Sequence, residues 1–138
     1  MTTVKLWTDE EAAAVPSVKA VFDDIRATRK SDFVNNFWRA LANQSELLER
    51  TWGSVKRVML EPGVLDPLTK ELVYIAASTV HSCSYCVHSH TAAARAKGLN
   101  DKQYGEFLAV LGMAAETNTL ANALQIPIDQ EFLTAGVL

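Results

Sequence analysis

The chain has 138 residues, of which 49% are hydrophobic and 21% are charged, and its formal net charge is -3. This length suits one domain with a core that needs no disulfide staples, so we expect residues 1–138 to form a single domain. The slightly acidic balance excludes the basic footprint of a protein that binds nucleic acid or an anionic membrane. The longest apolar run, Leu72 to Ala77, is far shorter than the ~20 residues of a membrane span.

The first residues lack the apolar stretch of a signal peptide, so we expect a cytoplasmic protein. A reducing cytosol gives a chain of this size little use for a structural disulfide. Yet the two cysteines, Cys83 and Cys86, stand at C-x-x-C spacing. Random placement would give that spacing on the order of one time in a hundred, so the pair indicates thiol chemistry.

Apolar residues recur at three- and four-residue steps along most of the chain, which predicts an all-α fold of about six helices. The first predicted helix begins at Pro16. Ser31 or Asp32 is expected to cap a second, short helix. Ser45 is expected to cap a third, which ends at Pro62.

Three more helices follow in the second half of the chain. Residues 66–67 are Asp-Pro, a capping residue and a first-turn proline, and they predict a helix from Leu68 to about Val80. A break near Ser82 leads into an Ala-rich helix that stops before Gly98. Residues 100–103 form a capping box for a last, long helix.

Both cysteines and all three histidines fall within residues 81–90. On a helix at ~100° per residue, Cys83, Cys86 and His90 share one face, whereas His88 lies on the opposite side. Cys86 and His90 form an (i, i+4) pair that can touch. Cys83 lies at or just before the helix N-terminus, where backbone N–H groups favour a thiolate. This face predicts a dithiol site at the start of a helix.

Glu71 is the candidate carboxylate of this site. On one continuous helix it would lie ~18 Å from Cys83, which is too far to act. If the chain reverses near residues 81–82, Glu71 and His90 face one another across a helical hairpin. An inward carboxylate has a raised pKa unless it pairs with an imidazole, and such a group suits a proton carrier.

Glu71, Cys83-x-x-Cys86 and His90 stand at the intervals of the AhpD-like (alkyl hydroperoxidase D) branch of the carboxymuconolactone decarboxylase superfamily, which the chain resembles over about residues 66–98. The resemblance implies an all-helical protomer that assembles into a homo-trimer or homo-hexamer. It also implies a thiol peroxidase that needs no cofactor or metal. At one position the chain departs from the founding peroxidases of this branch: they carry a histidine where Tyr85 stands here.

The resemblance further implies a catalytic cycle. Cys86, supported by His90 and Glu71, attacks a hydroperoxide and becomes a sulfenic acid. Cys83 condenses with it to a disulfide, which an external dithiol protein, lipoylated or thioredoxin-like, reduces. By thioredoxin logic the more exposed, helix-terminal Cys83 would instead attack first, so the order of attack stays open.

Other functions stay open beside the peroxidase. The chain could be a disulfide oxidoreductase without peroxide activity, or a cofactor-free enzyme like the decarboxylases of the superfamily. It could also be a metal-binding module, with Cys83, Cys86, His88 and His90 as zinc donors, although His88 points away from the others on a helix. We expect His81 and His88 to be surface or capping residues.

Overall fold

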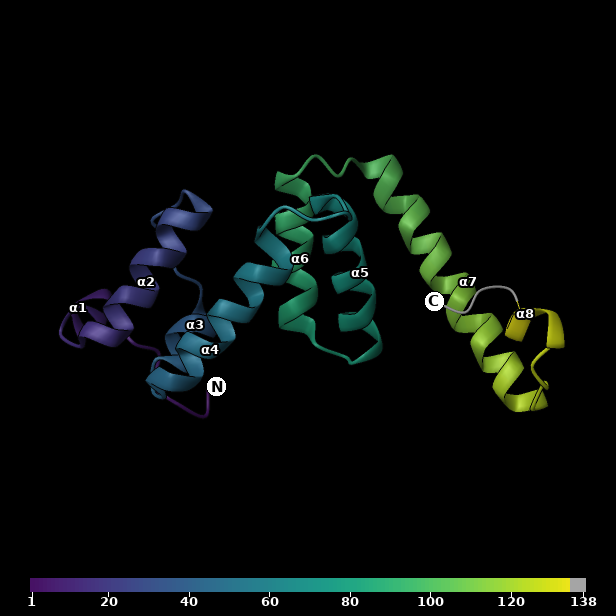
Figure 1. Ribbon diagram of the computed structural model, residues 1–138, viewed down its shortest axis with the longest axis horizontal. Coiled ribbons are helices and arrows are strands. Elements are labelled where there is room, and N and C mark those ends of the chain that lie inside the picture. The colour runs from purple at the N-terminus through teal and green to yellow at the C-terminus, as the bar shows by residue number, and fades with distance from the viewer. Residues whose placement is uncertain (135–138) are drawn as a thin grey trace. The chain divides into compact units, whose positions relative to one another are not determined.

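The computed structural model describes residues 1–134, and over these residues it is helical, with eight α-helices, one π-helical turn and no strand (Figure 1). The expected all-α class is confirmed. The chain divides into two compact units, Met1–Pro67 and Leu68 onward. The expectation of a single domain over residues 1–138 stays a prediction.

The first unit contains four α-helices and the π-helical turn: α1 (Asp9–Ala13), α2 (Pro16–Arg29), α3 (Asn36–Leu41), α4 (Ser45–Val55) and η1 (Lys56–Leu60). As predicted, α2 begins at Pro16. Its apolar stripe of Val18, Val21, Phe22 and Ile25 is buried. The stripe packs with Trp38, Leu48 and Trp52 of α3 and α4 into one core.

Two predicted helix starts in this unit are wrong. The second helix begins at Asn36 rather than after Ser31 or Asp32. The Ser31 hydroxyl instead accepts a hydrogen bond from the N–H of Phe33, which holds a turn that competes with helix. For the third helix, Gln44 is the N-cap and Ser45 is already the first helical residue. The short helix α1 carries too few residues to show a period, so the sequence pattern missed it.

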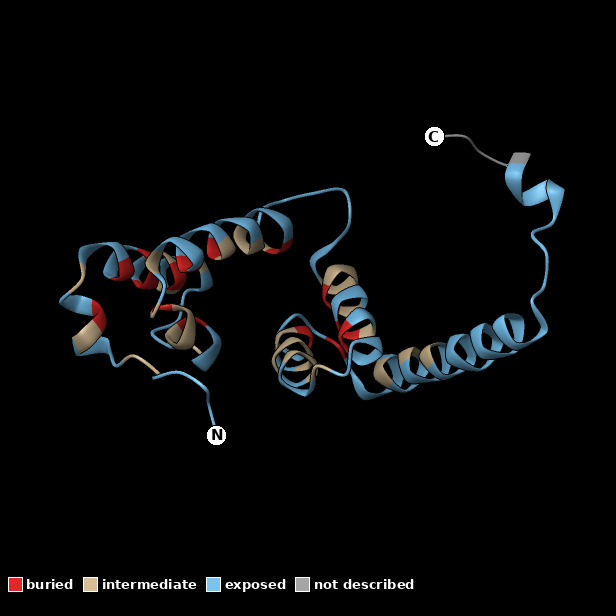
Figure 2. Ribbon diagram, turned by 90° about the horizontal axis from the view of Figure 1, so that it is seen from below, coloured by how far each residue is buried: buried red, intermediate tan, exposed pale blue. Residues whose placement is uncertain are grey.

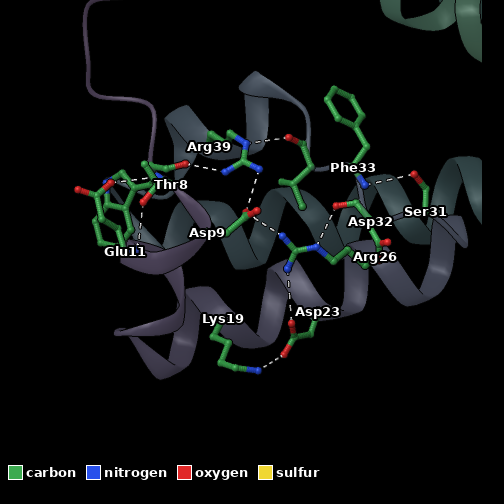
Figure 3. Close-up of polar contacts among 12 residues, drawn as sticks. Thr8, Asp9, Glu11, Lys19, Asp23, Arg26, Ser31, Asp32, Phe33 and Arg39 are labelled. Carbon is green, nitrogen blue, oxygen red and sulfur yellow. Dashed lines mark hydrogen bonds and ion pairs between the residues drawn. The ribbon is translucent and has the colours of Figure 1, made fainter.

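Asp9 is the centre of a cluster of polar contacts in the first unit (Figure 3). One oxygen of its carboxylate accepts hydrogen bonds from Arg26 at 2.8 Å and from Arg39 at 2.9 Å. Arg39 also donates to the backbone carbonyls of Val34 and Trp7. These contacts tie α1 to α2 and α3, so the residues of this cluster serve the scaffold.

The second unit contains α5 (Pro67–Val80), α6 (Ser84–Ala96), α7 (Asp101–Leu124) and α8 (Gln130–Thr134). Helices α5 and α6 form an antiparallel hairpin with its turn at residues 81–83 (Figure 1). Ile75, Ala94 and Leu99 are buried between them, and partly buried side chains of α5 and α7 pack against this core. The predicted break near Ser82 is therefore confirmed.

The long helix α7 starts as predicted and differs from its neighbours in burial. The capping box forms: the Asn100 side chain accepts from the N–H of Gln103 at 2.9 Å, and Gln103 returns a 3.0 Å bond. None of its residues is buried, and Figure 2 shows exposed and intermediate residues in its first half and exposed residues in its second half. Across residues 1–134, the helices are too short or too polar to cross a membrane.

Candidate redox site

The two cysteines lie at the N-terminus of α6, as the sequence predicts. Cys83 is the N-cap residue and Cys86 is in the first turn. Their Cα atoms are 5.3 Å apart, within the usual disulfide range, and the two sulfurs are bonded. The Cys83 sulfur also accepts a hydrogen bond from the N–H of Cys86 at 3.3 Å. A backbone donor aimed at this sulfur would also stabilise a thiolate there.

Cys83 is fixed in place by the end of α5 as much as by the start of α6. The N–H of Cys83 bonds to the carbonyl of Ser78 at 2.9 Å, and the N–H of Ser82 bonds to that of Thr79 at 3.1 Å. Ser82 has φ 54, so the two bonds form a Schellman motif with Ser82 in the left-handed position. One residue, Cys83, therefore closes α5 and opens α6.

Glu71 and His90 meet across the hairpin. The His90 Nδ1 atom lies 2.6 Å from a Glu71 carboxylate oxygen. The Glu71 side chain is only 4% exposed, and that of His90 is 21% exposed. Because an ionised carboxylate only accepts hydrogen bonds, Nδ1 must carry the proton. The other ring nitrogen, Nε2, is then left as the acceptor of a neutral imidazole.

Lys97 and Tyr74 complete this cluster, and neither is among the site residues predicted from the sequence. Lys97 Nζ donates to the second oxygen of Glu71 at 2.8 Å. The Tyr74 ring stacks on the His90 ring, with centroids 3.6 Å apart and planes inclined by 21°. A helical signal existed: Tyr74 follows Glu71 by three residues, and Lys97 follows His90 by seven, so each shares a face with its neighbour.

Glu71 is held in its ionised form. Burial raises the pKa of its carboxyl group. Hydrogen bonds from His90 and Lys97 and the positive charge of Lys97 outweigh burial, so the pKa of Glu71 lies below its ordinary value of 4.5. The sequence-based expectation of a raised pKa held only for an unpaired carboxylate, and here the carboxylate is paired.

The other histidines lie away from the Glu71 cluster. His81 and His88 are exposed, and the His88 Nδ1 atom lies 2.8 Å from the backbone carbonyl of Ser84. His88 and Cys83 line the same shallow, open depression at the hairpin turn. Its remaining lining residues are Ser78, Thr79, Ser82, Ser84 and Val87. Within the described part of the chain, no three His, Cys, Asp or Glu side chains are gathered to hold a metal ion.

Over residues 1–134, an all-helical fold, a C-x-x-C pair at a helix start and a contact between a buried glutamate and a half-buried histidine define a class of thiol-bearing helical proteins. The sequence model of the carboxymuconolactone decarboxylase family matches residues 46–129, more than half of the chain, so the chain belongs to this family.

Two known proteins are similar to this chain. A crystal structure of the alkylhydroperoxidase AhpD core from Rhodospirillum rubrum is 62% identical to this chain. The match covers 97% of this chain and 98% of that one, with a TM-score of 0.95, and it supports the AhpD-like branch. A Paracoccus denitrificans protein, uncharacterized protein 4 in cox locus, is 32% identical over 53 residues. That match covers 38% of this chain and 48% of the relative, so the chain spans about half the length of the curated protein.

Proposed function

We propose that the chain is a thiol peroxidase that reduces organic hydroperoxides through a Cys83–Cys86 dithiol–disulfide cycle. The observation that carries the proposal is the 2.6 Å contact between Glu71 and His90. It directs the protonated Nδ1 of His90 to the carboxylate and leaves Nε2 for the dithiol. Cys86 lies one helical turn before His90 on α6, so its thiol is the first candidate for proton transfer.

The first step forms a sulfenic acid. The Cys86 thiolate attacks the terminal peroxide oxygen, the O–O bond breaks, and the leaving alkoxide takes a proton. We assign His90 as the base that removes the thiol proton and the acid that delivers it to the alkoxide. Glu71 stabilises the imidazolium in between. The products are Cys86–SOH and an alcohol.

The second and third steps restore the dithiol. The Cys83 thiol attacks the Cys86 sulfenic acid, which releases water and forms the disulfide. An external dithiol protein, lipoylated or thioredoxin-like, then reduces the disulfide and is itself oxidised to a disulfide. We propose that Cys83 exchanges with this reductant, because it lines the open depression at the hairpin turn.

Thiol ionisation alone would not make this site a peroxidase. An ordinary thiol of pKa ~8.5 is a few per cent ionised at pH 7, so full ionisation raises the thiolate about thirtyfold. A pKa lowered by about two units also removes about tenfold in nucleophilicity, since the Brønsted slope is ~0.4–0.5. The net gain is only severalfold. Protonation of the leaving oxygen by the His90–Glu71 pair therefore has to supply most of the acceleration.

The test is the rate at which the reduced protein loses both thiols to an organic hydroperoxide. An unfolded peptide with residues 81–90 provides the reference rate. We expect loss orders of magnitude faster than in the peptide, with mass spectrometry showing one Cys83–Cys86 disulfide. Loss at the peptide's rate would contradict the proposal, because Glu71 and His90 would then not assist O–O cleavage.

The order of attack is tested separately. In Cys83→Ser, peroxide should trap a sulfenic acid at Cys86, detectable with a dimedone-type probe. In Cys86→Ser, we expect no sulfenic acid at Cys83. A sulfenic acid found only in Cys86→Ser would reverse the assignment of the two cysteines.

A second candidate function is thiol–disulfide exchange without peroxide chemistry. Two observations favour it: Tyr85 replaces the histidine of the founding peroxidases, and Cys83 lines an open depression together with His88. Such a protein would exchange rapidly with small dithiols and disulfides while reacting with hydroperoxide at the peptide's rate. The same purified protein serves both assays.

We also propose that the working protein is a homo-oligomer, a trimer or a hexamer, in the cytoplasm. Exposed apolar patches on a folded protein mark interaction surfaces. Five large apolar side chains of α7 are exposed in this chain: Leu108, Val110, Met113, Leu120 and Leu124. We propose that other copies of the chain cover these side chains.

Cell fractionation would test the cytoplasmic placement, and recovery of the protein with membranes or outside the cell would contradict it.

A further inference from the structure

The Glu71 carboxylate has two partners of different kinds. One oxygen accepts from the His90 imidazole at 2.6 Å, and the other accepts from the Lys97 ammonium at 2.8 Å. His90 lies within α6, and Lys97, seven residues further on, is the C-cap residue of the same helix. The peroxidase cycle uses His90 and Glu71 and assigns nothing to Lys97.

The C-terminal end of α6 fixes the position of Lys97. It is the C-cap residue, and the next two residues close the helix with a Schellman motif in which Gly98 has φ 97. The N–H of Leu99 bonds to the carbonyl of Ala94 at 3.0 Å, and both residues are buried. The side chain of Lys97 is 28% exposed, and its ammonium contacts a carboxylate whose side chain is only 4% exposed.

The charges around Glu71 come from few groups. From α6 the carboxylate faces His90 and Lys97, and on α5 Tyr74 stacks on the His90 ring. From α7, Tyr104 packs into the nearby core under the guanidinium of Arg95, 5.1 Å from its ring. Lys97 is thus the cation that pairs with the carboxylate while His90 is neutral. A buried carboxylate without such a cation would favour its protonated form.

We propose that Lys97 is a positioning residue for the redox site: its ammonium keeps Glu71 a carboxylate, so that Glu71 holds the His90 Nδ1 proton and leaves Nε2 free to accept. The effect of Lys97 on catalysis rests on the proposed function, in which the neutral Nε2 of His90 takes the thiol proton. A protonated Glu71 would no longer fix the His90 tautomer, and the site would lose its base as the pH falls.

The experiment compares Lys97→Met, Lys97→Gln and Lys97→Arg with the wild type in the fully reduced full-length chain. Two quantities are followed: the Glu71 carboxyl titration by ¹³C NMR, and the pH dependence of thiol oxidation by organic hydroperoxide. Lys102→Met is the matched control, because it makes the same change at an exposed lysine on the first turn of α7.

We expect Lys97→Met and Lys97→Gln to move the Glu71 titration to higher pH by on the order of one unit, as removal of a neighbouring charge does. The acidic limb of the thiol-oxidation profile should move by a similar amount. Lys97→Arg keeps the charge and should titrate like the wild type, and so should Lys102→Met. If Lys97→Met fails to fold, Lys97→Gln decides the test.

Two outcomes would overturn the proposal. An unchanged Glu71 titration in Lys97→Gln would show that the ammonium only covers the carboxylate. An equal shift in Lys97→Arg and Lys97→Gln would show that charge is not the cause. The NMR titration needs no peroxide turnover. A chain that lacks peroxidase activity would therefore still give a clear answer on Lys97, and the two failures remain distinguishable.

Discussion

At the scale of single residues, the site depends on the Glu71 carboxylate of α5 and on the two side chains that donate hydrogen bonds to it. His90 and Lys97 each occupy one oxygen, and Tyr74 covers the His90 ring. The Glu71 contact fixes which imidazole nitrogen carries the proton, and the Tyr74 ring restricts the orientation of the imidazole plane. Substitutions at these positions are therefore expected to change thiol chemistry more than they change the fold.

The carboxylate charge is tested by Glu71→Gln, which keeps the shape of the side chain. Without the charge, the imidazolium formed during proton transfer loses its stabilising partner. We expect thiol oxidation by hydroperoxide to slow by about tenfold to a hundredfold, which is at or below the lower end of the ~10²–10⁴-fold that general acid–base catalysis contributes, because His90 itself remains. Stopped-flow loss of thiols measures the rate. A wild-type rate in Glu71→Gln would remove Glu71 from the mechanism.

The same variant gives a test of stability against pH. The pKa of Glu71 in the folded chain lies below its ordinary value of 4.5, so its carboxylate stabilises the fold above that pH. This contribution should be lost as the pH falls from about 4.5 through the folded pKa. We expect the difference in unfolding free energy between wild type and Glu71→Gln to shrink over that range in urea titrations. Glu106→Gln, at an exposed glutamate of α7, is the control, and a pH-independent difference for Glu71→Gln would contradict the prediction.

The orientation of the His90 ring is tested at Tyr74. Tyr74→Leu removes the stacked ring, whereas Tyr74→Phe keeps it. A stacked aromatic pair contributes about 0.5–1.5 kcal/mol, so Tyr74→Leu should slow thiol oxidation by roughly two- to tenfold. Tyr74→Phe should react like the wild type. A loss of rate in Tyr74→Phe equal to that in Tyr74→Leu would instead assign the effect to the hydroxyl group.

At the scale of elements, both helices of the hairpin end with the same motif but use different residues. At the end of α6 the left-handed position is occupied by Gly98, with φ 97, and at the end of α5 it is occupied by Ser82, with φ 54. Glycine adopts positive φ without strain, whereas serine does so at a cost. Since the α5 motif carries Cys83, this strain lies directly next to the dithiol.

We therefore expect opposite effects on stability at the two positions. Ser82→Gly should raise the unfolding free energy, by up to about 1 kcal/mol, because it relieves the positive φ. Gly98→Ala should lower it by about 1 kcal/mol, because alanine resists that conformation. Gly105→Ala, inside α7 with open space around it, should stabilise the chain slightly. Chemical denaturation measures all three, and a destabilising Ser82→Gly would show that the serine side chain supports the turn.

At the scale of the whole molecule, burial is uneven. Figure 2 shows buried residues in the first unit and in the α5–α6 hairpin, whereas α7 has none. Large exposed apolar patches are unusual on a protein that works as a monomer. The proposed homo-oligomer follows from this imbalance.

The assembly is tested by placing a charge on α7. Val110→Glu and Leu120→Glu introduce carboxylates at two exposed apolar positions, and burying them against another copy would be unfavourable. We expect the wild type to sediment as a trimer or hexamer at micromolar concentration and these variants to sediment as smaller species. Lys102→Glu, on the first turn of α7, should sediment like the wild type. A monomeric wild type would contradict the proposed assembly.

Much of the local structure could be predicted from the sequence. The starts of α2 and α5 follow from Pro16 and Pro67, and the start of α7 follows from its Asn100–Gln103 capping box. Local signals failed where two uses of a side chain compete. Ser31 accepts a bond within a turn rather than capping α3, and α1 is too short for its period to be visible.

What the sequence alone determined about this protein is the all-helical class, the chain reversal near Ser82 and the position of Cys83 at a helix start, because these depend on residues close together in the chain. The contact of Glu71 with His90 was predicted from that reversal, whereas the tertiary structure alone decided that Lys97 also binds the Glu71 carboxylate. Lys97 lies 26 residues away in sequence, and its contact exists because α6 folds back along α5. Helical periodicity places Lys97 on the same face as His90, but it does not predict a contact with Glu71 on another helix. The ionised state of the Glu71 carboxylate, which sets the proposed chemistry of the site, therefore depends on packing rather than on any local motif.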